Sequence, residues 1–384
     1  MKLKLSFPLA LSLTLLTVAA CTGSRLFLLL FILALMLIAG AVLSVLWVSA
    51  TLEVNGELSG ETVRRGDDLV LSVRIRHRGL IPVAPLLLDL SDPAGSRERE
   101  IRLKNLPNRI QSMRLPIHAY HVGVYSVGLR SCTVEDLLGL VRKRVSLDQT
   151  SFDLVVLPRT FDVEPLELAP GDPGSELMAR ATEDLNAPSD IRNYQPGDAM
   201  KKIHWKLSMR KGELMVRKFD EPVLQDVLIL MDCSRPPSWG HPQAEADLRD
   251  ALLETTASVL TSQLSTDHQI RLPLPGSHPV DVERSMGLPI ALDYLARVDF
   301  SQTDRFERVL SMESSHLRKV GCVVVVSARL NIPMVDIMTR MHRSGPNIRV
   351  YLVTFAPEDE NVLSLIARLR HAGIDVSYVT PEPG

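Results

Sequence analysis

The sequence predicts a membrane-anchored α+β chain of several domains, with two N-terminal transmembrane helices, an antiparallel β-sandwich and a C-terminal α/β domain. Three patterns along the 384 residues predict this fold class. An uncharged apolar run comes first, short strands of alternating polarity follow, and continuous apolar strands then alternate with helical segments. The expected parts are a transmembrane hairpin at 1–49, a β-sandwich-like domain at 50–150, a connector at 151–222 and an α/β domain at 223–384.

Residues 26–48, LFLLLFILALMLIAGAVLSVLWV, contain no charged side chain. As a helix rising ~1.5 Å per residue, this run is ~34 Å long, which is enough to cross a hydrocarbon core of ~30 Å. A helix on the surface of a soluble protein normally has one polar face, because that face meets water. We therefore expect a transmembrane helix here.

The apolar run before it, at about residues 5–21, has two interpretations. It is a first membrane helix joined to the second through Thr22–Arg25, or it is a signal peptide, since a basic start and small residues before a cleavage point are typical of one. The letters VAAC, which end at Cys21, also resemble a lipoprotein cleavage box, and lipidation there would make the protein an exported lipoprotein. A full span only a few residues later would make a lipid anchor redundant, so we favour the hairpin.

The basic residues at the N-terminus predict the topology. Lys2 and Lys4 place the N-terminus inside the cell under the positive-inside rule, although Arg25 in the connector points the other way. Two crossings then return residues 50–384 to the cytoplasm. The prediction is a multi-pass protein of the cell membrane with cytoplasmic soluble domains.

Composition excludes some classes of function. The formal net charge is −2, so nothing global favours nucleic-acid binding, and any basic site must be local. The four cysteines are far apart, without a C-x-x-C pair, which argues against a zinc knuckle and fits free thiols in a reducing compartment. They are Cys21, Cys132, Cys233 and Cys322.

Period-two alternation begins shortly after the apolar runs. In DDLVLSVRIRHRG the apolar residues Leu69, Leu71, Val73 and Ile75 alternate with mostly polar ones, as in a half-buried strand. More short strand candidates follow: VAPLLLDL, EIRLKNL, RIQSMRLPI, GVYSVGLR and GLVRKRVSL. Closely spaced short strands separated by turn residues predict an antiparallel sandwich.

The last part of the chain has a different pattern. VLILM, CVVVVS, IRVYLVTF and DVSYV are continuous apolar runs, and four helical segments lie between them: AEADLRDALLETTASVLTSQL, LPIALDYLARV, VDIMTRMH and ENVLSLIARLRHAG. Gly373 suits the end of the last helix. Alternation of this kind predicts a mostly parallel, Rossmann-type sheet covered on both faces. Ligands of such sheets bind beyond the carboxyl ends of the strands.

Hard oxygen ligands follow the first of these strands. In DCSRPPSW, Asp232 and Ser234 come directly after VLILM, and a carboxylate with a hydroxyl suits Mg²⁺ or Ca²⁺. The segment resembles the start of the metal-ion-dependent adhesion site of von Willebrand factor A domains, D-x-S-x-S. The second serine position holds Pro236, and Ser238 comes too late for the spacing.

Two more hydroxyls are candidates for the same site, Ser327 after the next strand and Thr303 in SQTD. We expect at most a degenerate metal site at Asp232 and Ser234, and no other cofactor. The structural alternative is that Asp232 caps the turn and Ser234 satisfies backbone groups.

A dense basic stretch lies before the α/β domain, DIRNYQPGDAMKKIHWKLSMRKGELMVRKF at residues 190–219. Pro196-Gly197 fits a type II turn, Asp198 can cap a helix from Ala199 to about Arg210, and Gly212 can end that helix. ELMVRKF predicts a strand. Three interpretations of the charge remain: contact with anionic lipid, docking of an acidic partner, or a solvated face.

Two side chains of this stretch invite a functional interpretation. We expect Trp205 to be a buried anchor, because large aromatic side chains are mostly buried. His204 beside it has no Ser or Cys nucleophile placed with it, which argues against a general base. The sequence assembles no catalytic constellation, so we do not expect an enzyme.

This basic stretch is similar to the signature of the bacterial family called domain of unknown function 58. The matching residues are Arg192, Tyr194, Pro196, Gly197, Asp198, Lys202, Ile203, Trp205, Lys206, Arg210, Gly212, Glu213, Leu214 and Val216. His204 departs from the pattern, where the family usually has Asp. Upstream, Gly123, Tyr125, Asp136, Gly139 and Leu140 resemble further elements of the family, with Leu137 in place of its proline.

The resemblance implies a degenerate von Willebrand A-like C-terminal domain and a MoxR-type AAA+ ATPase as partner, since the two genes are commonly neighbours. We therefore expect a membrane-anchored, non-enzymatic adaptor or scaffold with an assembly or chaperone-like role. The expected partner-binding residues are Arg192, Tyr194, Gly197, Asp198, Lys201, Lys202, Trp205, Lys206, Arg210 and Lys211. The alternatives are a metal-dependent ligand-binding protein or hydrolase at Asp232, Ser234 and His204, and the exported lipoprotein. The oligomeric state and the client do not follow from the sequence.

Overall fold

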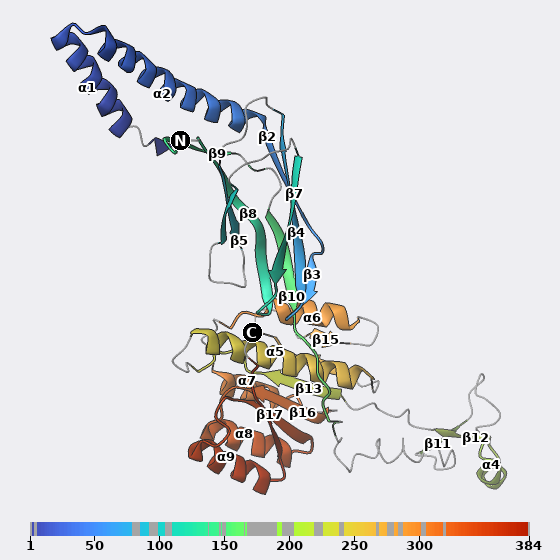
Figure 1. The fold of residues 1–384 in the computed structure, drawn as a ribbon. Helices are drawn as coiled ribbons and strands as arrows, with labels where there is room; N and C mark the ends of the chain where they lie inside the picture. The colour runs from blue at the N-terminus through green and yellow to red at the C-terminus, as the bar shows by residue number, and fades with distance from the viewer. Residues whose placement is uncertain are drawn as a thin grey trace. The chain divides into compact units, whose positions relative to one another are not determined.

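The structure is a computed structural model that describes most of the chain in two units, Met1–Pro158 and Arg159–Pro383. The described residues are 2–3, 6–78, 85–91, 99–103, 110–136, 138–145, 147, 151–164, 166, 190–193, 203–218, 226–237, 242–265, 269–274, 280–282, 287–300, 305–317 and 320–382. Together they form a mixed α+β protein with several sheets (Figure 1). Each unit has its own hydrophobic core.

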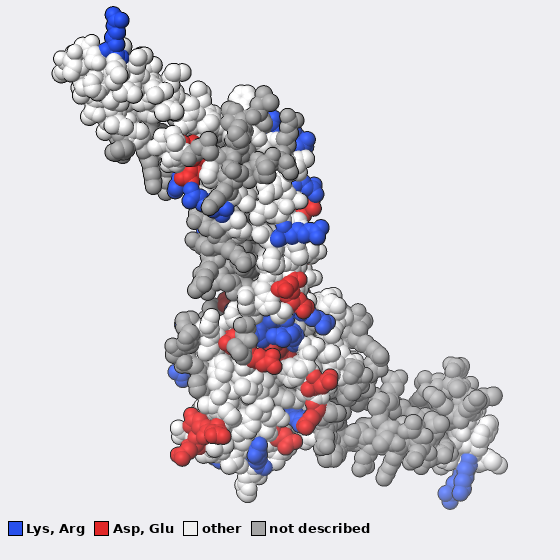
Figure 2. Space-filling model, in the orientation of Figure 1, with Lys and Arg blue, Asp and Glu red and all other residues white. Residues whose placement is uncertain are grey.

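The first unit opens with a helical hairpin. Helices α1 (Ser6–Thr22) and α2 (Arg25–Thr51) are joined at Gly23, whose positive φ of 65° suits a residue without a Cβ. Among the described helices, α2 alone has the length and apolarity to cross a membrane, and α1 is a shorter apolar helix. Figure 2 shows almost no charged side chain on the hairpin. The two-crossing anchor stays a prediction.

The C-terminal part of α2 has a second role. Val45 and Val48 are almost fully buried and belong, with Ala41, to the hydrophobic core of the β-sheets that follow. The sequence predicts one continuous span at 26–48. The structure retains one helix long and apolar enough for that span, and it also places the last turns of this helix in the protein core.

Two sheets make up the rest of this unit. The first is antiparallel and has three strands, β2 (Leu52–Leu58), β4 (Asp68–His77) and β7 (Ile110–His118), with β4 in the middle. The second has seven strands: β1 (Lys2–Leu3), β3 (Thr62–Arg64), β5 (Leu86–Ser91), β6 (Arg99–Leu103), β8 (Gly123–Glu135), β9 (Val141–Val145) and β10 (Ser151–Leu157). Its pairs are antiparallel, except that β10 and β3 are parallel.

The alternation predicted for β4 is confirmed. Leu71, Val73 and Ile75 are fully buried, and they share one core with Leu86 and Leu88 of the other sheet. Because side chains alternate across a strand, the polar residues between them face away from that core. Two sheets with a common core are what the short alternating strands predict.

The second unit contains a six-stranded sheet in the order β15-β14-β13-β16-β17-β18 (Figure 1). Its strands are β13 (Asp226–Met231), β14 (Ile270–Leu272), β15 (Val280–Val282), β16 (Val320–Ser327), β17 (Asn347–Val353) and β18 (Asp375–Val379). All pairs are parallel, except that β15 is antiparallel to β14. The four apolar runs of the sequence are therefore confirmed as strands, whereas β14 and β15 are too short to carry a pattern.

Helices cover this sheet. α5 (Pro242–Ser265) contacts β13, β14, β16 and β17, and α6 (Leu288–Ala296) packs on α5. α7 (Phe306–Glu313), α8 (Ile332–Arg343) and α9 (Glu360–His371) bury their apolar faces in a core with strand residues such as Val323 and Val350. Gly373, at φ 83°, follows α9 as predicted, and α7 was missed.

A small module carries the basic signature. Strands β11 (Asp190–Asn193) and β12 (Met215–Lys218) are antiparallel, and helix α4 (Trp205–Lys211) precedes β12. The prediction of a helix starting at Ala199 is wrong at Ile203 and His204, because Ile203 forms a β-bridge with Val216 and His204 is the N-cap of α4. Residues 199–202 lie outside the described part of the chain. Gly212 ends α4 in the left-handed conformation, as predicted.

Candidate functional site

The order of the six-stranded sheet reverses between β13 and β16, which are parallel neighbours. The crevice beyond the carboxyl ends of two such strands is where α/β sheets bind ligands. Asp232 directly follows β13, and Ser327 is the last residue of β16. The topology therefore brings together two of the residues that the sequence selects.

Asp232 is buried at this edge, with 1% of its surface exposed. Its Oδ1 accepts hydrogen bonds from the backbone N–H of Ser234, at 3.1 Å, and from the Ser234 hydroxyl. Its Oδ2 lies 2.9 Å from the hydroxyl oxygen of Ser327. A buried carboxylate needs such donors, because a buried polar group without a hydrogen-bond partner costs about 1–3 kcal/mol, and more when it is charged.

A cation completes the cluster. The Nε atom of Arg329 lies 3.2 Å from Asp232 Oδ2, close enough for an ion pair although the N–H is not aligned for a hydrogen bond. Nη2 of Arg329 donates to Ser234 Oγ at 2.8 Å and also to the carbonyl of Arg235. We call Asp232, Ser234, Ser327 and Arg329 the strand-end cluster. Sequence reasoning missed Arg329, because only the pairing of β13 with β16 brings it to Asp232.

Ser327 fixes the backbone that carries this arginine. Its hydroxyl accepts the Arg329 N–H at 3.1 Å, and its single hydrogen is shared between Asp232 Oδ2 and the Arg329 carbonyl, 2.8 Å away. The guanidinium therefore extends from a short turn with a defined conformation.

A divalent cation at this site would compete with Arg329 for the same oxygens. A metal at Asp232 and Ser234 would need the oxygens that the guanidinium contacts, and Pro236 supplies no hydroxyl. Thr303 and Ser238, the other hydroxyl candidates, lie outside the described residues. The metal itself stays a prediction.

A cavity of about 470 Å³ opens beside the cluster, lined by Arg235, Pro236, Glu245, Ala246, Arg249, Asp299 and Phe300. Arg235 donates to both carboxylate oxygens of Glu245, at 2.8 and 3.1 Å. These hydrogen bonds lower the pKa of Glu245. The pair is a surface pair, and such pairs contribute little to stability.

The cysteine next to Asp232 is not a nucleophile. Burial, and secondarily the neighbouring carboxylate, raises the pKa of Cys233 to about 12. Burial also raises the pKa of Cys132 and Cys322 to about 12, so all three remain protonated thiols at neutral pH. The four cysteines are free, as predicted.

Another cavity, of about 520 Å³, lies at the opposite edge of the sheet, at the amino ends of β16, β17 and β18. Cys322, Asn347 and Asp375 line it, together with Arg349, whose Nη2 donates to Glu164. This contact attaches the segment after Pro158 to the sheet.

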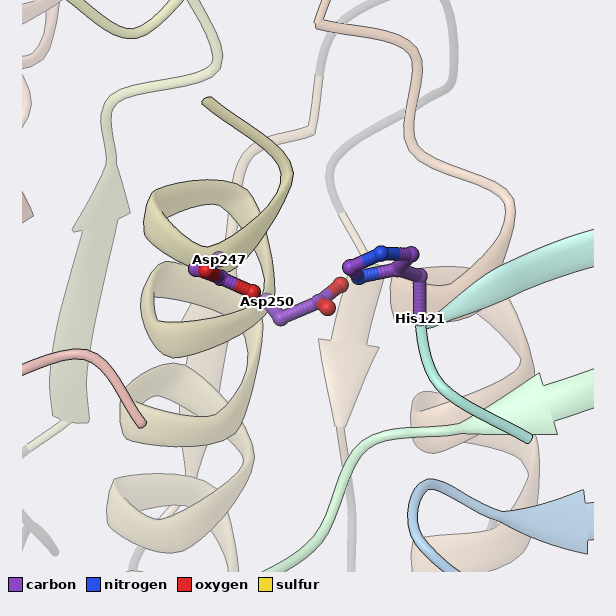
Figure 3. Close-up of side chains that lie close together, drawn as sticks. All are labelled: His121, Asp247 and Asp250. Atoms are coloured by element: carbon purple, nitrogen blue, oxygen red, sulfur yellow. The ribbon is translucent and has the colours of Figure 1, made fainter. Parts of the chain in front are cut away.

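The sequence analysis also did not single out two buried acidic residues on α5. Asp247 and Asp250 are buried in the second unit, one helical turn apart (Figure 3). Arg249 Nη2 lies 4.0 Å from Asp250 Oδ1. His121, the third side chain drawn in Figure 3, belongs to the first unit, between β7 and β8.

The signature module is built on Ser208. This buried hydroxyl accepts the N–H of Met215 at 2.8 Å and lies 3.0 Å from the carbonyl of His204, within donating distance. Nδ1 of His204 accepts the N–H of Leu207 at 3.2 Å. His204 therefore caps the N-terminus of α4 with its own side chain.

The prediction that Trp205 is buried is wrong. This residue is 58% exposed, not a buried anchor, and Met209 one turn later is 86% exposed. Lys206, Arg210 and Lys211 are exposed on the same helix. Figure 2 shows Lys and Arg side chains beside uncharged surface on this module.

The other predicted partner-binding residues are placed only in part. Arg192 lies in β11, although its side chain is not described. Tyr194, Gly197, Asp198, Lys201 and Lys202 lie outside the described residues.

The upstream motif is structural. The Asp136 carboxylate accepts the N–H groups of Val141, at 2.7 Å, and of Leu138, at 3.1 Å. It thereby holds the turn between β8 and β9, in which Gly139 has φ 69°. Leu140 and Tyr125 pack against the core of the first unit.

Comparison with known proteins finds a family match within the second unit. The model of the family described as "Protein of unknown function DUF58" matches residues 190–363. The uncharacterized protein YeaD of Bacillus subtilis (strain 168) is 26% identical over 227 residues, which cover 55% of this chain and 53% of that protein. The chain thus spans about half the length of this curated relative.

Solved structures give weaker likenesses. The CARDB domain of a Pyrococcus furiosus protein, solved with di-metal ions, is 16% identical, with a TM-score of 0.20, over 28% of this chain and 90% of that one. The sporulation control protein Spo0M of Bacillus subtilis is 13% identical, with a TM-score of 0.17, over 38% of this chain and 58% of that one. Both TM-scores are low, so neither likeness defines the fold of this chain.

Proposed function

We propose that this protein is a membrane-anchored, non-enzymatic adaptor whose signature module docks a protein partner, a MoxR-type AAA+ ATPase. The observation that carries the proposal is the exposed pair Trp205 and Met209 on α4, 58% and 86% exposed. Large apolar side chains left in water are typical of interaction sites. Trp in particular is enriched among the residues that dominate binding energy.

The spacing of the pair supports a docking face. Residues four apart lie on the same side of a helix, so Trp205 and Met209 form one apolar strip. Lys206, Arg210 and Lys211 border it, which favours a partner surface that combines an apolar pocket with acidic residues. This favours a protein over a lipid surface as the partner, because the module offers a compact apolar strip and not a broad apolar face.

Rigidity of the module supports the same conclusion. Ser208 ties α4 to β12, and Gly212 ends the helix without strain. Side chains presented on a fixed element lose less entropy on binding than those on a loose loop. The exposed strip is therefore organised before a partner arrives.

The membrane part of the proposal is a two-helix anchor with cytoplasmic domains. The pairing of β1 with β9 is consistent with it, since Lys2 lies opposite Arg142. The chain thus enters and leaves the hairpin at the same end, where the first unit folds. With Lys2 and Lys4 inside, that end is the cytoplasmic one.

For the second unit we propose a degenerate von Willebrand A-like domain. Its strand order, with the antiparallel edge strand β15, and the position of Asp232 and Ser234 after β13 support this assignment. The absence of enzymatic activity is also a proposal. It is supported by the strand-end cluster, in which the Asp232 carboxylate is engaged by three neighbouring side chains.

The test is capture of a purified MoxR-type AAA+ ATPase by the full-length protein in detergent. We expect Trp205→Ala and Met209→Ala each to weaken capture about tenfold or more, as loss of a central apolar contact does. Leu363→Ala is the matched control, because Leu363 is an exposed apolar residue on α9. Equal capture by all four proteins would refute the docking role of α4.

A membrane surface is the competing occupant of the strip, and a second measurement addresses it. Flotation with vesicles containing anionic lipid compares the wild type with Trp205→Ala. A loss of lipid binding in the variant, with ATPase capture unchanged, would reject the adaptor proposal.

A further inference from the structure

We infer that Arg329 is the built-in cation of the strand-end cluster, and that its guanidinium takes the place a divalent metal ion would have between Asp232, Ser234 and Ser327. The second unit therefore forms this edge of its sheet without a metal. This inference does not depend on the proposed docking of a partner at α4. It concerns a different part of the second unit and a different chemistry.

The charge of Asp232 requires a counter-ion. The carboxylate is 1% exposed, and its donors Ser234 and Ser327 are neutral. Neutral donors satisfy the lone pairs but leave a net negative charge inside the protein, which is costly unless a cation is near. Arg329 Nε at 3.2 Å supplies that cation.

The contacts of Arg329 are those of a bridging ion. Its guanidinium contacts a carboxylate oxygen of Asp232, the hydroxyl oxygen of Ser234 and the backbone carbonyl of Arg235. Carboxylate, hydroxyl and carbonyl oxygens are also the ligands that Mg²⁺ and Ca²⁺ select. One organic cation thus binds a set of hard oxygens that would otherwise suit a metal.

The position of the guanidinium is set by the fold. The Arg329 N–H bonds Ser327 Oγ at 3.1 Å, and Ser327 ends β16. Ser234 follows β13, so the arginine connects the loops after two neighbouring parallel strands. The Arg329 side chain makes these contacts while it stays 38% exposed.

A second cation has no room in this arrangement. A metal placed on Asp232 would lie within a few ångströms of the guanidinium, and two like charges at that distance repel. The ligand set is also short, since Pro236 stands where a second serine would supply a hydroxyl. The disagreement with the metal site expected from the sequence therefore has two physical causes, the guanidinium of Arg329 and the missing hydroxyl at Pro236.

Removal of the guanidinium is predicted to create a metal site. Arg329→Ala leaves the buried carboxylate with two hydroxyls and without a counter-ion. A divalent ion can then compensate the charge, with water completing its coordination. Arg329→Gln serves as a second variant, because its amide can keep a hydrogen bond to Ser234 while it lacks the charge.

The experiment measures Mn²⁺ binding to the full-length protein in detergent, by the electron paramagnetic resonance signal of free Mn²⁺ and by calorimetry with Mg²⁺. We expect no site in the wild type, and one saturable site in each Arg329 variant that folds. Each variant should also gain thermal stability on adding Mn²⁺, and the wild type should not.

The control is the double variant Asp232→Asn with Arg329→Ala, in which the acquired site should be lost. Two results would overturn the inference. One is a Mn²⁺ site in the wild type that Asp232→Asn removes, which would mean that Arg329 and a metal coexist. The other is a folded Arg329 variant without Mn²⁺ binding. If neither variant folds, the wild type and Asp232→Asn decide: Mn²⁺ binding that Asp232→Asn removes counts against the inference, and its absence counts for it.

Discussion

Ser208 and Met215 are joined by a backbone-to-side-chain hydrogen bond that holds the signature module together: the Met215 N–H donates to the Ser208 hydroxyl at 2.8 Å. The same hydroxyl also lies 3.4 Å from the Met215 carbonyl. A buried serine thus performs for α4 and β12 the role that a ladder hydrogen bond performs between strands.

Ser208→Ala should loosen the module. The Met215 N–H would lose its acceptor inside the protein, at a cost of about 1–3 kcal/mol. Amide hydrogen exchange of residues 203–218 should accelerate accordingly, while the rest of the second unit is unchanged. Ser364→Ala, at an exposed serine of α9, is the control and should exchange as the wild type does. Unchanged protection of Met215 in the Ser208 variant would show that another group holds the module.

Asp136→Ala should destabilise the first unit. Its carboxylate accepts two backbone N–H groups in the turn between β8 and β9, and both would lose their partner. The expected loss is about 1–3 kcal/mol in the free energy of unfolding. Urea unfolding of the full-length protein in detergent measures it. Asp153→Asn, on the exposed side of β10, should stay within about 0.5 kcal/mol of the wild type.

His77 should make the first unit sensitive to acid. Burial lowers the pKa of His77 below 6.5, and Nε2 has no hydrogen-bond partner among the described residues. In the unfolded chain this histidine takes up its proton at higher pH than in the folded protein. The stability from neutral His77 is therefore present above about pH 6.5 and is lost as pH falls below it.

The measurement is unfolding of the wild type and of His77→Gln between about pH 8 and pH 5. Only the difference between the two proteins reports on His77, because other groups titrate in both. The wild type should lose more stability on acidification than the variant does. A difference that does not change with pH, or one that shrinks toward high pH, would argue against a buried neutral imidazole.

Val45→Ala separates the two roles of α2. Val45 is 1% exposed in the core of the first unit, whereas Leu43 on the same helix is 65% exposed. We expect Val45→Ala to cost on the order of 1–3 kcal/mol of stability, because it leaves a cavity. Leu43→Ala should leave stability nearly unchanged. Thermal unfolding in detergent compares them, and equal effects would mean that this part of α2 does not pack on the sheets.

Short sequence patterns predicted much of the fold. The alternation of Leu71, Val73 and Ile75 identifies β4, and Gly373 identifies the end of α9. Such features depend on the periodicity of a strand or on the backbone freedom of one residue, and both are written within a short window. The same reasoning identified Asp232 and Ser234 at the end of a buried strand.

The sequence alone therefore determined the identity of most elements, the apolar N-terminus and three of the four residues of the strand-end cluster, all but Arg329. Tertiary structure decided the rest. Arg329 lies 95 residues from Ser234, and only the parallel pairing of β13 with β16 brings them together. Trp205 was expected inside because aromatic side chains usually are, yet burial depends on which elements pack over a residue. Val45 is the opposite case, since it was expected in lipid and lies in the protein core. An apolar residue has no preference between lipid and a protein core, so only the packing of α2 on the sheets decides where it lies.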